Sequence, residues 1–146
     1  MATDFVSGSM VLAAPVELVF EYVSDYDHIP EWVAGISACR REPGAPQDFT
    51  VDISVGAVTH SVSFTTATSI PNRSIVLTAL GRYEASVDIA FESAGPRGCN
   101  VTTEVRYPVE EGLFYRPVNK MGKLIATKLL ERTGRNLAER IIGSSG

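Results

Sequence analysis

The chain has 146 residues, 45% of them hydrophobic and 21% charged, which predicts one soluble globular domain over residues 1–146. No apolar run approaches the ~20 residues of a membrane span, the N-terminus lacks a secretory signal, and two cysteines are too few for a disulfide framework. We therefore expect a cytoplasmic protein with reduced cysteines and no transmembrane segment. The net charge of −4 and the lack of a binding motif argue against nucleic acid as a partner.

The N-terminal segment predicts one strand followed by two short helices. Residues 5–12 form the expected strand. Pro15 stands where a helix begins, and Glu17 lies in its first turn, where the helix dipole favours an acidic side chain. This helix is expected over residues 15–24. A second short helix over residues 28–33 holds the only tryptophan, Trp32.

Six strand-like segments follow and predict an antiparallel sheet with one covered face. In most of them apolar and polar residues alternate, so one face is apolar and the other polar. Turn-forming residues separate the segments, and such short connections make sequential strands neighbours. The expected strands are residues 36–42, 48–55, 58–68, 73–80, 82–93 and 99–109.

The segment 113–142 predicts one long C-terminal helix, because every fourth position from Met121 to Ile141 is apolar except for Thr133. The row drifts around the helix and makes a broad apolar stripe. We expect the half from Met121 to Leu129 to face a ligand space and the half from Thr133 to Ile141 to pack as core. The order of elements predicts an α+β fold in which a seven-stranded curved antiparallel sheet wraps around this helix.

The same C-terminal segment is basic. Seven basic and two acidic residues give it a net charge of +5, so the rest of the chain carries −9. Lys120, Lys128 and Arg135 lie in a narrow arc away from the apolar row. This arc is either a solvated outer face or a docking surface for an anionic protein partner or membrane headgroups.

Two stretches carry a resemblance to a known family. The stretch APVELVFEYVSDYDHIPEW at Ala14–Trp32 has the Ala-Pro, Val-Phe, acidic end and tryptophan typical of the START-like, or SRPBCC, superfamily of helix-grip folds. The run GLFYRPVNKMGKLIATKLLERTGRNLAERI is similar to that superfamily's final helix. Within it the chain resembles small bacterial proteins of the polyketide cyclase/dehydrase type. The resemblance implies a hydrophobic cavity between the sheet and the final helix.

Any chemistry must come from polar residues that strand parity turns toward this cavity, because the sequence holds no nucleophile motif, phosphate loop or metal cluster. We expect neither a metal nor a cofactor. His60 is a candidate general base, or else a neutral histidine packed in the core. Tyr83 is the second catalytic candidate, as a hydrogen-bond donor to a ligand carbonyl, or else a packing residue. The convergent Arg, Tyr and His set of dedicated aromatic cyclases is missing.

Other residues are candidates for lining the cavity. Trp32 either covers one mouth of the cavity as a lid or packs the second helix. Asp25, Asp27, His28 and Glu31 either form a catalytic or metal cluster or cap and solvate the helix ends. The predicted ligand-binding residues are Trp32, Val62, Phe64, Tyr83, Val87, Thr103, Tyr107, Met121, Ile125 and Leu129.

Three functions are open from the sequence. The first is binding of a hydrophobic small molecule, such as a lipid, a quinone or a polyketide-like compound. The second is a polyketide cyclase or dehydratase that acts on a poly-β-keto or aromatic precursor through His60 and Tyr83. The third is a module that binds a protein partner through the basic arc of the last helix. We expect a monomer or a weak homodimer.

Overall fold

The computed structural model describes residues 2–55, 57–81, 85–109 and 116–145, without the side chains of residues 2–4, 55, 58, 107–109, 116–126 and 142–145. The chain forms seven strands, with two short α-helices and a 3-10 turn between the first two strands, and a long final helix. Their bounds are β1 (Ala2–Leu12), α1 (Val16–Ser24), η1 (Tyr26–His28), α2 (Ile29–Trp32), β2 (Ile36–Glu42), β3 (Ala45–Val55), β4 (Val58–Ile70), β5 (Ser74–Ala79), β6 (Ser86–Ser93), β7 (Cys99–Val109) and α3 (Arg116–Ser145).

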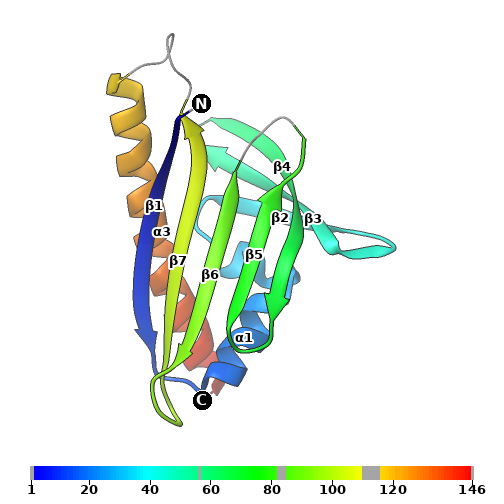
Figure 1. Ribbon diagram of the computed structural model, residues 1–146, viewed down its shortest axis with the longest axis vertical. Helices are drawn as coiled ribbons and strands as arrows, with labels where there is room; N and C mark the ends of the chain where they lie inside the picture. Colours follow the sequence, from blue (N-terminus) through cyan, green and yellow to red (C-terminus); the bar gives the residue numbers. More distant parts are fainter. Residues whose placement is uncertain (1, 56, 82–84, 110–115, 146) are drawn as a thin grey trace.

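The strands make one antiparallel sheet in the order β1-β7-β6-β5-β4-β3-β2. From β2 to β7 each strand pairs with the next one in the sequence, as the short turns predict, and β1 closes the order by pairing with β7. Figure 1 shows α3 running along β1 and β7, with α1 near the opposite end of the sheet from the N-terminus. The predicted helix-grip architecture is therefore confirmed.

Several predicted boundaries differ from the observed ones. The long helix extends to Ser145 rather than ending at residue 142, and residues 113–115 lie outside the described residues. The fifth strand ends at Ala79, and Gly81 follows with a positive φ of 86°, a conformation that glycine adopts without strain. The segment predicted as a helix over residues 28–33 is divided into η1 and the single turn α2. There Asp25 caps η1, because its carboxylate accepts from the Asp27 N–H at 3.2 Å.

The core lies between the concave face of the sheet and the helices. Helix α1 buries Val16, Val19 and Val23 on one side, which is the spacing of a single helical face. At the C-terminal end of α3, Leu137 and Ile141 are 2% and 0% exposed. Among the described residues no helix is long and apolar enough to cross a membrane.

Candidate functional site

An inner cavity of about 360 Å³ lies between the concave face of the sheet and α3. Its walls come from the inward-facing residues of β1 to β7, the α2 turn and the segment of α3 around Leu129. Apart from the indole N–H of Trp32, the polar side-chain groups in the described lining are three hydroxyls, on Tyr26, Thr103 and Thr133. None of the described lining residues is charged. The cavity is therefore suited to an apolar molecule.

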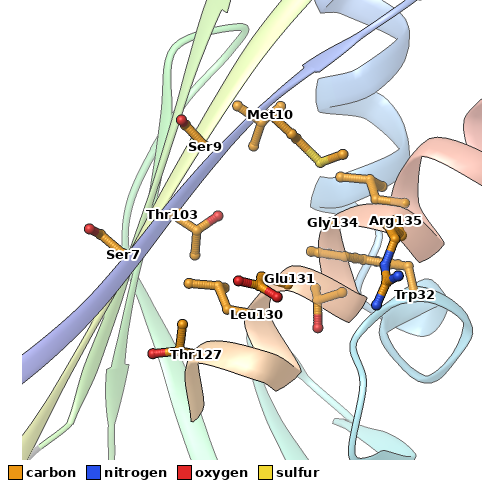
Figure 2. A pocket seen from close by; sticks show the side chains of 14 residues that line it. Ser7, Ser9, Met10, Trp32, Thr103, Thr127, Leu130, Glu131, Gly134 and Arg135 are labelled. Atoms are coloured by element: carbon orange, nitrogen blue, oxygen red, sulfur yellow. The ribbon is translucent and has the colours of Figure 1, made fainter. Parts of the chain in front are cut away.

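A second, outer pocket of about 570 Å³ lies between the edge strand β1 and α3 (Figure 2). Its lining includes the exposed charged residues Glu131 and Arg135. Figure 2 shows the Ser7 and Ser9 hydroxyls directed away from the pocket, so these residues contribute the backbone of the edge strand. The outer pocket is more polar than the inner cavity. Four residues line both spaces, namely Trp32, Thr103, Leu130 and Thr133.

Trp32 forms a wall between the two spaces and is 7% exposed. Two hydrogen bonds hold its segment against α3. The Trp32 carbonyl accepts from Asn136 Nδ2 at 3.3 Å, and the Ala34 N–H donates to Thr133 Oγ1 at 2.9 Å. The buried indole N–H has no hydrogen-bond partner among the described residues. The sequence placed Trp32 at the cavity, and the structure puts it in the walls of both spaces.

Tyr26 lines the inner cavity, but its hydroxyl has a structural role. The distance from Tyr26 Oη to Thr66 Oγ1 is 2.6 Å, and Thr66 in turn donates to the Gln47 carbonyl at 3.0 Å. Because Thr66 has one hydroxyl proton, Tyr26 must be the donor to Thr66. Burial raises the pKa of Tyr26, against the lowering effects of the Thr66 hydrogen bond and the Arg41 charge. At neutral pH this phenol is therefore a neutral wall residue whose proton is already bound.

The structure brings half of the predicted ligand-binding residues to the inner cavity. Trp32, Phe64, Val87, Thr103 and Leu129 line it. Val62 is half-buried and packs against the core without lining either space. The side chains of Tyr107, Met121 and Ile125 lie outside the described residues, as does Tyr83 entirely.

His60 has the predicted face but not the predicted surroundings. It pairs with Ile53, which lines the inner cavity, so parity places the two residues on the same face of the sheet. His60 is nevertheless exposed and lines neither space. It is the third residue of β4, near the β3–β4 turn. Strand parity fixes the face of a residue but not its depth under the helix.

The lining also includes residues that we did not predict. Phe49 and Val51 pair with Phe64 and Val62, and the alternation of β3 was sufficient to place them on the inner face. Leu130 and Thr133 flank the predicted Leu129 on α3. Leu130 and Thr133 line the cavity because of how α3 is rotated about its axis relative to the sheet. The spacing of the apolar residues does not define this rotation. In the Thr133–Ile141 half, Leu137 and Ile141 belong to the buried core as expected, although Leu137 also lines the outer pocket. Thr133 is buried too, but it lines both spaces and is not plain core.

The acidic residues around His28 form a surface cluster outside both spaces. His28 Nδ1 lies 2.5 Å from Glu31 Oε2, and its ring stacks on Tyr22 with centroids 4.3 Å apart. Arg140 of α3 lies 3.8 Å from Glu31, which connects the cluster to the long helix. Burial raises the pKa of Tyr22, and the Glu31 charge adds to this effect. Among the described residues no group of His, Cys, Asp and Glu side chains could hold a metal ion.

A curved antiparallel sheet that holds a long helix across an apolar cavity defines the helix-grip class of folds. Within this class, the family model described as polyketide cyclase / dehydrase and lipid transport matches residues 5–141, so the chain belongs to this family. No curated protein matches the chain.

Solved structures share the fold at low sequence identity. A START superfamily protein from Mycobacterium smegmatis superposes with a TM-score of 0.78 at 19% identity, covering 95% of this chain and 97% of that one. The protein TTHA0849 from Thermus thermophilus gives 0.84 at 14% identity, with 98% and 100% covered. The Zhui aromatase/cyclase from Streptomyces sp. R1128 gives 0.75 at 13% identity, with 98% and 93% covered. At these identities the likeness establishes the fold alone.

Proposed function

We propose that the protein binds a hydrophobic small molecule in the inner cavity. The observation that carries this proposal is an interior space of about 360 Å³ whose described lining is apolar except for three hydroxyls and one indole N–H. Burial of apolar surface contributes on the order of 25 cal/mol per Å². A ligand with roughly 250 Å² of apolar surface would therefore gain about 6 kcal/mol before the costs of association.

The ligand class follows from the same lining. With no charged side chain in the described walls, a charged group in the inner cavity would lose its hydration without compensation. Lipids, quinones and polyketide-like compounds satisfy this condition. The family description, which joins polyketide cyclisation with lipid transport, supports lipids and polyketide-like compounds among these ligands.

Filling the cavity is the direct test. Val87 is a half-buried residue of β6 that lines the inner cavity, so Val87→Phe would place an aromatic ring in the ligand space. Titration with the uncharged fluorophore N-phenyl-1-naphthylamine should give saturable fluorescence enhancement in the unchanged protein. We expect Val87→Phe to weaken this binding at least tenfold.

The matched control is Ala90→Phe, which adds the same ring on the exposed outer face of the same strand. It should bind the fluorophore as the unchanged protein does. Equal binding by both variants would show that the fluorophore binds elsewhere, and the proposal would then fail.

A second candidate is a polyketide cyclase or dehydratase, favoured by the family description and by the fold shared with the Zhui aromatase/cyclase. Among the described lining residues of the inner cavity, Tyr26 is the one group that titrates, and its proton is bound to Thr66. The candidate therefore depends on the two residues predicted from the sequence, of which His60 is exposed and lines neither space and Tyr83 lies outside the described residues. If His60→Ala and Tyr83→Phe both leave turnover of a poly-β-keto thioester unchanged, this assignment of the catalytic residues is wrong.

A further inference from the structure

Thr103 is the one sheet residue in the described lining of the inner cavity whose side chain can form a hydrogen bond. In the described part of the chain, all other sheet residues that line the inner cavity are aliphatic or phenylalanine. Thr103 is half-buried in β7 and pairs with Ile89 of β6 on one side and Gly8 of β1 on the other. Figure 2 shows its side chain on the pocket side of β1. A single hydroxyl thus stands in an apolar wall.

This hydroxyl stands where the two spaces meet. Gly8 has no side chain to cover it, and Leu130 of α3 approaches so closely that a Cβ built on Gly8 would lie 3.1 Å from Leu130 Cδ2. Thr103 and Leu130, together with Trp32 and Thr133, line both spaces. The inner cavity and the outer pocket are therefore two adjoining chambers that share one boundary.

The two chambers differ in chemistry. The inner one is apolar, while the outer one also exposes the backbone of the edge strand β1 and the side chains of Thr127, Glu131 and Arg135. Because Glu131 and Arg135 carry opposite charges, the outer lining has no excess of either sign. A molecule that is complementary to both chambers has an apolar body and a polar, uncharged end.

We propose that the ligand carries an uncharged carbonyl group that accepts a hydrogen bond from the Thr103 hydroxyl, with its apolar body in the inner cavity and its polar end directed to the outer pocket. This inference rests on the proposed function of the inner cavity. Of the two hydroxyls other than Thr103 that line this cavity, Tyr26 donates its proton to Thr66. The Thr133 hydroxyl accepts from the Ala34 N–H and is buried, whereas Thr103 is half-buried and therefore more accessible to a ligand. Thr103 is the hydroxyl that recognises the ligand.

The test uses two probes that differ in the carbonyl alone. 2-Acetylnaphthalene and 2-isopropylnaphthalene have nearly the same shape, and each is titrated as a competitor of N-phenyl-1-naphthylamine. We expect the unchanged protein to prefer the ketone. Thr103→Val keeps the shape of the residue and removes the hydroxyl, so it should lower the ratio of ketone to hydrocarbon affinity about fivefold, the effect of one hydrogen bond. Thr103→Ser retains the hydroxyl and should retain the preference.

Thr102→Val is the matched control, because Thr102 is the neighbouring, exposed threonine on the outer face of β7. It should leave both affinities unchanged. An unchanged affinity ratio in Thr103→Val, or tighter binding of the 2-naphthoate anion than of the ketone, would overturn the carbonyl inference while leaving the inner-cavity proposal intact. A protein that binds none of these probes, N-phenyl-1-naphthylamine included, would overturn both.

Discussion

At the scale of single residues, the surroundings of each hydroxyl in the inner cavity decide what it can do. The Tyr26 hydroxyl is bound to Thr66 and its ring packs against Phe49, with centroids 4.4 Å apart. Tyr26 therefore stabilises the wall. Thr103 stands among aliphatic side chains, where a hydroxyl lowers the cost of burying a ligand carbonyl. From residue type alone, both Tyr26 and Thr103 would be predicted to bind the ligand through their hydroxyls.

Tyr26→Phe should separate these roles. The variant loses the hydrogen bond to Thr66, which costs about 1 kcal/mol of unfolding free energy, while the shape of the cavity is kept. Urea unfolding at pH 7 measures this cost. Binding of N-phenyl-1-naphthylamine should not change, and a large loss of binding without a loss of stability would contradict the structural role.

The pH dependence of Tyr26 has a defined sign. Burial raises its pKa in the folded protein above the ordinary value of 10.0, so the unfolded chain loses the phenol proton first as pH rises. The stability that depends on the neutral phenol is fully present below pH 10.0 and is lost as pH rises from there through the folded pKa. Urea unfolding of the unchanged protein should therefore show a steeper loss of stability above about pH 10 than Tyr26→Phe shows. The raised pKa of Tyr22 remains in both proteins and is the internal control.

At the scale of elements, the contact of α3 with the segment after α2 positions the boundary between the two chambers. Thr133 is buried and accepts from the Ala34 N–H, and Asn136 donates to the Trp32 carbonyl. These bonds satisfy the carbonyl of the last residue of α2 and the N–H of a residue just after it, groups for which a single helical turn has no partner of its own. The long helix therefore holds Trp32 in place.

Thr133→Val should destabilise the protein by about 1–3 kcal/mol, because the part-buried Ala34 N–H loses its acceptor. Urea unfolding gives the free-energy change, and hydrogen exchange of the Ala34 amide should accelerate. Thr133→Ser keeps the acceptor and should be close to the unchanged protein in both measurements. If the valine variant protects this amide as well as the serine variant does, the bond does not hold the segment.

At the scale of the whole molecule, the sheet and α3 together leave an interior space that neither could form alone. Close packing fills most protein interiors, so a cavity of about 360 Å³ represents lost dispersion contacts. A ligand that occupies it binds only the folded protein. Folding and binding are then linked through mass action.

At a ligand concentration of one hundred times Kd, binding raises the free energy of unfolding by about 2.7 kcal/mol. For a chain of this size we expect 2-acetylnaphthalene to raise Tm by roughly 6–10 °C. Circular dichroism melting measures the shift. Val87→Phe, whose cavity is filled, should show a much smaller shift, and an equal shift in both proteins would place the binding outside the inner cavity.

The strand pattern shows how much of the candidate site could be predicted from the sequence. Alternation correctly put Phe64, Val87 and Thr103 on the inner face, because side chains alternate sides in any strand. It put His60 on the same face, and the structure leaves that residue exposed near a turn. Alternation predicts the face of the sheet on which a side chain lies. Whether that side chain is buried depends on which part of the molecule covers its position. Which inward residues line open space therefore had to come from the packing of α3.

The sequence by itself determined the α+β class, the order of the elements and the resemblance to the family, because periodicity, turn residues and local motifs are properties of neighbouring residues. Only the tertiary structure decided where the chambers lie. The boundary between the chambers lies where Gly8 of β1, Thr103 of β7 and Leu130 of α3 come together, and these residues are distant in the chain. The register between β1 and β7 and the rotation of α3 about its axis determine this arrangement. No hairpin turn fixes the register between β1 and β7, and the rotation of α3 depends on side-chain packing across the domain, so local patterns leave both undetermined.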